Sequence, residues 1–266
     1  MAETSLARMI AILDLFKSPR AAWPAEAIAE AMSYSVPTVY RYVRELVACG
    51  LLRRDVGGTF VLGPAATELD YHIRTGDPLI TAAAAPMAAL AADTGMDAVL
   101  ATICGARIIT VHHELGADPA RMSFGRGRRM PMFRGAMSLC IMAALPRAQM
   151  RKLHQECGDA PPDLSWDEFV DEVKQLRRRG YAYTEGALDP NLAGLALPFT
   201  EPDRHIVASL GLVSRQTRLA TSDKTPLLAA LRECAQRIHT TLGSACTAGP
   251  TAADLNAHAA PTAGSL

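Results

Sequence analysis

PAEAIAEAMSYSVPTVYRYVRELVACGLLRRDVGGTFVLG, residues 24–63, is the stretch that decides the fold of the N-terminal part of the chain. Its beginning, Pro24 to Met32, predicts a short helix that starts at a proline, a residue favoured in the first helical turn. After residues 33–35, apolar residues recur at helical spacing from Val36 to Val47, and the pattern stops at Gly50, which favours a helix end there. The spacing therefore predicts two helices separated by a three-residue turn.

A β-hairpin is predicted directly after the second helix. Leu51, Leu52 and residues 60–62 flank the pair Gly57-Gly58, and paired glycines favour a tight turn between strands. Upstream, one apolar stripe at spacings of three and four predicts a helix that belongs to the core or to a dimer interface; its members are Leu6, Met9, Ile10, Leu13 and Phe16. Helix, helix, turn, helix and hairpin together indicate a winged helix-turn-helix.

The rest of the chain predicts a linker and a second domain. Pro64 to Gly76 is typical of a helix that leads away from the hairpin, and Asp77-Pro78 marks a boundary. We therefore expect a winged helix-turn-helix over residues 1–63, a linker helix over 64–78, a second domain over 79–246 and a flexible tail over 247–266, which is rich in Ala, Thr, Pro and Gly.

The second domain is predicted to mix helices and strands, which makes the whole chain α+β. Ser165 and Glu168 form a capping-box pattern that begins a helix, and Gly180 ends it. The other expected helices are Ile80–Asp93, Gly135–Ala144, Pro146–Cys157 and Pro226–Leu242, the last closed by Gly243; the expected strands are Ala98–Cys104, Arg107–Glu114, Tyr181–Glu185, Leu192–Phe199 and Ile206–Val213.

Composition excludes several classes of protein. Among 266 residues, 49% are hydrophobic and 20% charged, which suits folded domains and not a disordered chain. The net charge is zero, so evidence for nucleic-acid binding must be local. No apolar run reaches the roughly 18 residues that span a bilayer, and no signal-like segment is present, so we expect a cytoplasmic protein that does not bind membranes. The six cysteines are scattered, which predicts neither a metal site nor a cofactor.

The second helix of the helix-turn-helix carries side chains suited to reading DNA. If Val36, Val39, Val43 and Leu46 face the core, the opposite face can enter a major groove. An arginine fork donates two hydrogen bonds to guanine or to phosphate, and hydroxyls can contact either. We expect DNA contacts from Ser35, Pro37, Thr38, Tyr40, Arg41, Tyr42 and Arg44, with backbone contacts from Arg53 and Arg54 of the hairpin. A protein-protein module remains the alternative, because such a domain also serves that purpose.

Over residues 6–242 the sequence resembles the IclR family of bacterial transcriptional regulators. Thr38-Val39-Tyr40-Arg41 is similar to Thr-Val-His-Arg in the family's recognition helix, and Leu62-Gly63 is similar to the end of its wing. Further along, Gly127 to Met132, Gly180-Tyr181-Ala182 and Gly194-Leu195-Ala196 resemble motifs of the family's effector domain. The resemblance implies a GAF-like domain after the linker helix, a ligand-responsive regulator of catabolic genes, double-stranded operator DNA as partner, and a homodimer or homotetramer.

Two departures from the family pattern affect these expectations. Val36 and Pro37 replace the usual basic and small residues before the recognition-helix threonine, so the base preference should differ. Residues 133–140, FRGAMSLC, stand where the family commonly has His-x-Thr-Ala-x-Gly-Lys-Ala, so the lysine is missing.

The resemblance also implies where an effector binds. In relatives a small organic acid or aromatic compound lies between the sheet and a helix N-terminus, which favours anions. Carried over by motif, the expected effector residues are Met130, Phe133, Arg134, Gly135, Ala136, Met137, Thr184, Gly194, Gly211 and Val213. Arg134 could pair with a carboxylate, the alternative being that it is a surface residue and Met137 ordinary core. Small lining residues favour an aromatic acid.

An enzymatic function is disfavoured by the sequence. Cys140, His112 and His113 could supply a nucleophile and a base, but adjacent residues of a strand point to opposite faces, so the two histidines cannot act together. No Gly-rich phosphate loop, Gly-x-Ser-x-Gly elbow or HExxH motif occurs. The remaining alternative is a ligand-sensing protein whose winged domain mediates protein contacts in place of DNA binding.

Overall fold

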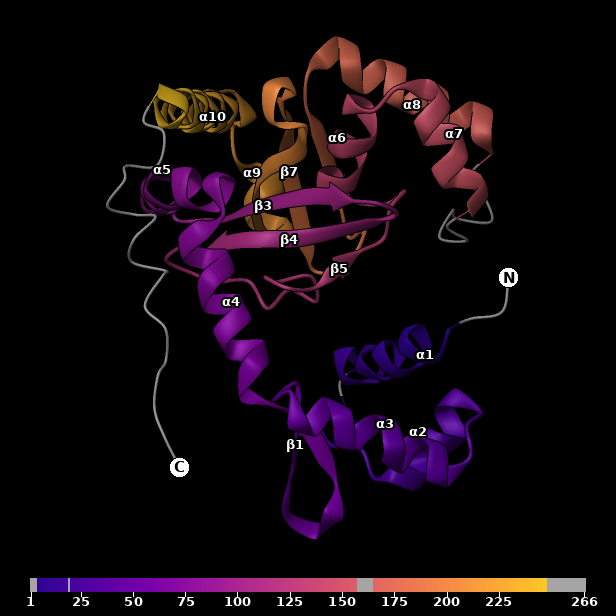
Figure 1. Ribbon diagram of the computed structural model, residues 1–266. Helices are drawn as coiled ribbons and strands as arrows, with labels where there is room; N and C mark the ends of the chain where they lie inside the picture. The colour runs from indigo at the N-terminus through magenta and orange to yellow at the C-terminus, as the bar shows by residue number, and fades with distance from the viewer. Residues whose placement is uncertain (1–3, 19, 157–164, 248–266) are drawn as a thin grey trace. The chain divides into compact units, whose positions relative to one another are not determined.

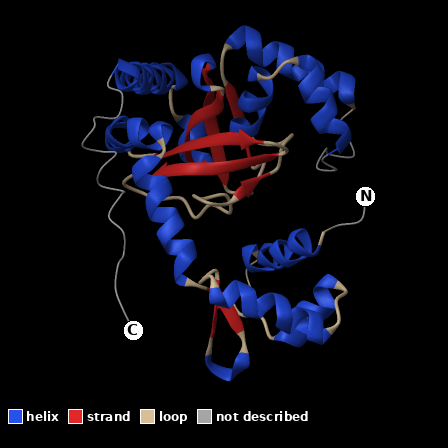
Figure 2. Ribbon diagram, viewed as in Figure 1, coloured by secondary structure: helices blue, strands red, loops and turns tan. Residues whose placement is uncertain are grey.

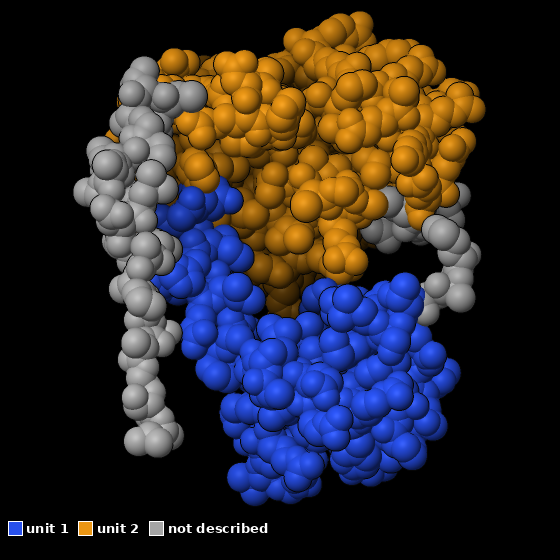
Figure 3. Space-filling model, viewed as in Figure 1, with its two compact units in different colours: residues 1–77 blue, residues 78–266 orange. Residues whose placement is uncertain are grey.

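The computed structural model describes residues 4–18, 20–156 and 165–247. The chain divides into two compact units, with the boundary between Asp77 and Pro78 (Figure 3). Nearly all of the predicted tail, residues 248–266, lies outside the described residues, as does Cys157. In the described part of the chain, no helix is both long and apolar enough to cross a membrane.

Unit 1 contains the predicted winged helix-turn-helix followed by the linker helix (Figure 1). Its elements are α1 (Ser5–Ala11), η1 (Ile12–Lys17), α2 (Ala25–Met32), α3 (Val36–Ala48), β1 (Leu52–Arg54), η2 (Val56–Gly58), β2 (Phe60–Leu62) and α4 (Pro64–Gly76). Ile12, Ile28, Val39 and Leu52 are almost fully buried in its core. The core therefore joins all three helices of the motif to the first strand of the wing.

The wing is a hairpin whose turn depends on glycine. Gly57 and Gly58 have φ values of 79° and 77°, a region that glycine occupies without steric cost. Strands β1 and β2 pair antiparallel, with Leu52 opposite Leu62. Trp23 extends the hairpin, because its backbone N–H donates to the Phe60 carbonyl at 2.9 Å and its carbonyl accepts from the Phe60 N–H at 2.8 Å. The wing is thereby fastened to the segment before α2.

The prediction for the first helix was wrong in its detail. The α-helix ends at Ala11 and continues as a 3-10 helix, which turns 120° per residue and so changes the face that meets the core. Ile12 and Phe16 are buried, whereas Leu6 and Ile10 are more than half exposed. The expected single stripe therefore splits into a buried part and an exposed part.

Unit 2 is built on a six-stranded antiparallel sheet in the order β5-β4-β3-β8-β7-β6. The strands are β3 (Asp97–Cys104), β4 (Arg107–Glu114), β5 (Arg129–Met130), β6 (Ala182–Glu185), β7 (Leu192–Glu201) and β8 (Ile206–Arg215). The helices are α5 (Pro78–Thr94), α6 (Ala136–Ala144), α7 (Arg147–Glu156), α8 (Trp166–Arg179), η3 (Pro202–Arg204), α9 (Gln216–Thr221) and α10 (Lys224–Thr247). This mixed α/β unit confirms the predicted fold class.

Helices cover both faces of this sheet (Figure 2). Alternate residues of a strand point to opposite faces. Ala98 and Leu100 of β3 therefore pack with α5 and α10, whereas Val99 and Ala101 pack with α6 and α8. The sheet is thus the middle of three layers, with a core on each side.

Of the sequence signals for helix ends, the capping box and Gly180 are confirmed and Gly243 is not. The capping box is present: the Glu168 N–H donates to Ser165 Oγ at 3.3 Å, and the Ser165 N–H donates to Glu168 Oε2 at 2.9 Å. Gly180 ends α8 with a φ of 77°. The predicted end of the last helix at Gly243 was wrong, because α10 runs on to Thr247. Gly243 is absent from the positive-φ glycines, so it is an interior helix residue and not a cap.

Candidate functional site

The start of α3 is fixed by its own first residues. Ser35 Oγ accepts from the Thr38 N–H at 3.4 Å and lies 2.8 Å from Thr38 Oγ1. This N-cap satisfies a backbone donor that the helix leaves free. Pro37 is exposed in the first turn, where its lack of an N–H costs nothing. Ser35, one of the predicted DNA contacts, is therefore exposed and also caps the N-terminus of α3.

Tyr42 does not lie on the exposed face of α3, so its predicted role as a DNA contact is corrected. Its exposed fraction is 4%, and its hydroxyl lies 3.0 Å from Ser5 Oγ of α1. Its ring also meets the Tyr34 ring edge-on, with centroids 6.1 Å apart. Tyr42 follows buried Val39 by three positions, and residues at this spacing share a helix face. Tyr42 therefore joins the recognition helix to α1.

The remaining predicted residues form an exposed, mainly basic surface on α3 and the wing. Tyr40, Arg41, Arg44, Arg53 and Arg54 are all exposed, and Thr38 is half-buried. Two of these arginines have acidic partners: Arg44 pairs with Glu45 at 3.1 Å and Arg53 pairs with Asp55 at 3.2 Å. Such exposed pairs are weak, so phosphate oxygens can replace their carboxylates at little cost.

A small hollow between α3 and the wing escaped the sequence analysis. It measures about 130 Å³ and is lined by Tyr40, Val43, Arg44, Val47, Arg54 and Phe60. Val47, the last apolar residue of the helical pattern, is exposed. At the tip of the wing, Val56 is also exposed. The surface that carries the arginines thus includes apolar side chains as well.

In unit 2, most predicted effector residues meet at the first turn of α6. They line a small cavity beside the sheet: Met130, Gly135, Ala136, Met137, Thr184, Gly194 and Val213, together with Phe124, Ala187, Leu188, Asp189, Leu192 and Ala193. The Ala136 N–H donates to Thr184 Oγ1 at 3.1 Å, so one free donor of the helix start is already satisfied. The walls are predominantly apolar.

Three predicted effector residues do not line this cavity. Phe133 is buried with its ring 5.2 Å from the Phe169 ring. Gly211 lies under Met137, where a Cβ would stand 2.5 Å from Met137 Sδ. Arg134 is exposed and donates from Nη2 to the Ala187 carbonyl at 2.6 Å. The structure therefore does not bring Arg134 to a ligand in this cavity.

The cavity is nearly closed in this conformation. Its volume is about 30 Å³, which is room for a water molecule or two and not for an aromatic ring. Leu188 fills the space in front of Gly135, since a Cβ on Gly135 would lie 3.1 Å from Leu188 Cγ and Cδ1. Leu188 belongs to the turn between β6 and β7. The side chain that limits the cavity is therefore on a loop and not in the sheet.

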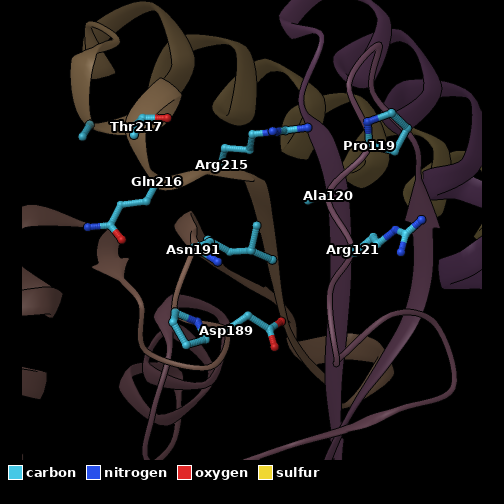
Figure 4. A pocket seen from close by; sticks show the side chains of 11 residues that line it. Pro119, Ala120, Arg121, Asp189, Asn191, Arg215, Gln216 and Thr217 are labelled. Atoms are coloured by element: carbon cyan, nitrogen blue, oxygen red, sulfur yellow. The ribbon is translucent and has the colours of Figure 1, made fainter.

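A larger groove adjoins this cavity (Figure 4). It has a volume of about 960 Å³ and shares Asp189 and Leu192 with the cavity. Its other lining residues are Pro119, Ala120, Arg121, Pro190, Asn191, Arg215, Gln216, Thr217 and Ala220. Sequence analysis missed the groove, because three segments far apart in the chain form it.

A buried carboxylate holds one wall of the groove. Asp97 is fully buried, and its oxygens accept from the Gly116 N–H at 2.7 Å and from the Ala120 N–H at 2.8 Å. His113 Nε2 lies 3.6 Å from Asp97 Oδ2. Burial alone would raise the pKa of Asp97, but the nearby His113 ring and the hydrogen bonds from Gly116 and Ala120 outweigh it and keep that pKa below its usual value. The charged form of Asp97 therefore holds the segment from Gly116 to Ala120 in place at the groove wall.

The groups considered for catalysis serve the fold. Cys140 Sγ lies 3.3 Å from the Ala196 carbonyl, and burial raises the pKa of this thiol to about 12. A thiol with so high a pKa forms no thiolate nucleophile near neutral pH. His112 Nε2 lies 2.9 Å from Glu114 Oε1, and His113 faces Asp97. Within the described ranges, no group of three or more His, Cys, Asp or Glu could hold a metal ion.

Comparison with known proteins agrees with this architecture. Residues 5–56 match the model of the IclR helix-turn-helix domain, and residues 73–240 match that of the C-terminal domain of IclR-type bacterial transcriptional regulators. Two curated relatives are the HTH-type transcriptional regulators KipR of Bacillus subtilis, 22% identical over 84% of this chain and 90% of its own, and XynR of Escherichia coli, 23% identical over 90% and 97%.

Solved structures show the same fold. An IclR-type transcriptional regulator from Alicyclobacillus acidocaldarius superposes with a TM-score of 0.78 at 23% identity, covering 90% of this chain and 98% of its own. An IclR homologue from Microbacterium hydrocarbonoxydans, complexed with 4-hydroxybenzoate, gives a TM-score of 0.74 at 22% identity, covering 91% and 100%. With both family models matched, the chain belongs to the IclR family of bacterial transcriptional regulators and carries the family's effector-binding domain.

Proposed function

We propose that the protein binds an operator duplex through α3 and the wing, and that an aromatic or other carboxylic acid bound in unit 2 changes this binding. The observation that carries the proposal is the exposed basic surface of the winged domain, with Arg41 and Arg44 on the helix and Arg53 and Arg54 on the wing. Because the whole chain has no net charge, binding to DNA must depend on a local basic surface such as this one. The regulated genes are those for catabolism of the acid.

Fluorescence anisotropy tests the DNA-binding part of the proposal. The full chain is titrated into labelled duplex from upstream of its own gene, and into a scrambled duplex, at salt concentrations from about 50 to 200 mM. We expect saturable binding that prefers the upstream sequence and weakens steeply with salt. Equally weak binding to both duplexes would instead favour the alternative that the winged domain contacts proteins.

Matched arginine variants locate the surface. Arg53→Gln is expected to reduce the slope of log affinity against log salt by about one, because it removes one phosphate contact. Arg178→Gln removes the same charge from the exposed face of α8 in unit 2 and is expected to leave the slope unchanged. An equal effect of both variants would show that net charge acts in place of a defined surface.

The identity of the effector rests on the cavity at the start of α6. Its lining is largely apolar, and the Microbacterium hydrocarbonoxydans homologue was solved with 4-hydroxybenzoate, which supports an aromatic acid as the ligand class. Sites for organic ligands usually measure about 300 to 1,000 Å³, so the cavity of about 30 Å³ must enlarge. Leu188 and the flexible Met137 are the side chains whose movement makes room.

We also propose that the protein is a dimer or tetramer assembled through exposed apolar residues of unit 1. Leu6 and Ile10 on α1 are exposed, as are Leu69 and Ile73 on α4. Apolar side chains that gather on such helices favour burial against a second copy, and a dimer places two recognition helices on successive half-sites. In sedimentation velocity, Ile10→Glu should shift the protein toward monomer, whereas Leu115→Glu, at an exposed leucine of unit 2, should not.

A further inference from the structure

The groove beside the cavity contains an arginine already bound to a carboxylate. Arg215 Nε lies 3.1 Å from Asp118 Oδ2, and Arg215 Nη2 lies 3.2 Å from Asp118 Oδ1. Two parallel hydrogen bonds are the geometry by which a guanidinium recognises a carboxylate. Figure 4 shows Arg215 extended toward the segment that carries Pro119 and Ala120. The Arg215 guanidinium therefore has carboxylate-binding geometry, and in this structure it binds the Asp118 carboxylate of the same chain.

The backbones on both sides of this pair are fixed. Gly116 and Ala120 flank Asp118, and both donate to buried Asp97. Gly116 is packed so tightly that a Cβ would lie 2.6 Å from the Gly95 carbonyl oxygen. Arg215 is the last residue of β8, opposite Leu192 in the strand register. The segments on either side of the groove are thus held in place independently of the Arg215–Asp118 pair.

The side chains of the pair, in contrast, are free to exchange partners. Arg215 and Asp118 have exposed side-chain fractions of 65% and 53%. An exposed ion pair contributes little to stability, because water and salt screen it. Rotation of the Asp118 side chain alone would release the guanidinium, with no movement of the backbone that Asp97 holds. A carboxylate from solution can then take the same two hydrogen bonds.

The position of Arg215 suits an acid with an apolar body. Leu192, opposite Arg215 on β7, lines both the groove and the apolar cavity, and so does Asp189. An aromatic acid can therefore direct its ring toward Leu192 and the cavity while its carboxylate stays in the open groove. Arg134 offers no such arrangement, since it lies outside the cavity and binds the Ala187 carbonyl.

We propose that Arg215 binds the carboxylate of the effector, and that Asp118 occupies the same edge of the guanidinium as an internal competitor until an acid replaces it. This inference rests on the proposed function, in which the effector is an organic acid. It predicts opposite effects for the two members of one ion pair. Loss of Arg215 removes the ligand's partner, whereas loss of the Asp118 charge removes the competitor. A purely structural ion pair would make both losses act in the same direction.

Isothermal titration calorimetry on the full chain tests these opposite signs. The probes are benzoate, 4-hydroxybenzoate and 3-phenylpropionate, each beside its neutral amide. Arg215→Gln should weaken binding of the acid by about three- to thirtyfold, because the charge-assisted pair with the acid is lost while the weaker pair with Asp118 no longer competes. Asp118→Asn should tighten binding by up to about fivefold, the range of an exposed ion pair. Affinity for the amide should stay the same in both variants, which also shows that they are folded.

Two further arginine variants separate the role of Arg215 from a general effect of positive charge. Arg107→Gln removes an exposed positive charge at the opposite end of β4 from the groove and should leave acid binding unchanged. Arg121→Gln removes the other cation that lines the groove. The inference is overturned if Arg215→Gln binds the acid as the unmodified protein does, if both members of the pair weaken binding alike, or if Arg121 alone carries the preference for the acid. In those cases the proposed function stands, whereas failure of the unmodified protein to bind any probe overturns both.

Discussion

Gly211→Ala is expected to destabilise unit 2, because the added methyl group has no room between the sheet and α6. A Cβ at this position would lie 2.5 Å from Met137 Sδ, 2.9 Å from the Leu195 carbonyl oxygen and 3.0 Å from Ala196 Cβ. The sulfur belongs to a flexible side chain and can move, but the carbonyl belongs to β7, which is paired on both sides within the sheet. Overpacking of this kind costs about 1 to 3 kcal/mol.

Thermal unfolding followed by circular dichroism measures this cost. For a unit of this size, 1 kcal/mol corresponds to a change in Tm of about 2 to 4 °C, so a fall of about 2 to 12 °C is expected. Gly243→Ala is the matched control. It makes the same chemical change inside α10, where a Cβ meets nothing within 4 Å, and alanine in a helix is about 1 kcal/mol more favourable than glycine. An unchanged or raised Tm for Gly211→Ala would refute the close packing of α6 on β8.

Three shorter predictions concern the recognition helix and the groove. Arg41→Ala should weaken binding to the preferred duplex by about 1 to 3 kcal/mol in anisotropy titrations while the melting curve is unchanged. Tyr42→Phe should lower the free energy of unfolding by about 0.5 to 1.5 kcal/mol, because the hydrogen bond to Ser5 is lost, and it should leave the salt dependence of DNA binding as it was. The depressed pKa of Asp97 contributes stability that is fully present above its unfolded value of 3.8 and is lost as pH falls below it; acid unfolding of Asp97→Asn should lack this contribution, and identical acid profiles for the two proteins would contradict it.

Sequence reasoning located the elements whose signals are local. The capping box of Ser165 and Glu168 and the glycines at 57, 58 and 180 act within a few residues, and the structure has each of them in its expected conformation. Tyr42 was misplaced because an amphipathic side chain fits either face of a helix. Its hydroxyl contacts Ser5, which lies 37 positions away in the sequence, so that partner had no local signal.

At the candidate ligand site, too, some residues could be located from the sequence and others could not. Most of the effector residues expected from the family resemblance, Gly135 and Thr184 among them, line the cavity at the start of α6. Arg134 lies on the surface, which was the alternative left open for it, since its place next to Gly135 does not fix the direction of a long side chain. The groove had no sequence signal, because residues near 119, 189 and 215 meet only when the sheet and its loops are assembled.

The measurement that tests the central claim most directly is the affinity of the full chain for its upstream duplex with and without a saturating aromatic acid. The account predicts sequence-preferring, salt-sensitive binding whose dissociation constant changes with the acid, and no such change with the corresponding amide. A ligand with equal affinity for both states of the protein shifts nothing. An acid that binds unit 2 in calorimetry and leaves the DNA affinity unchanged would contradict the claim that the two sites are coupled.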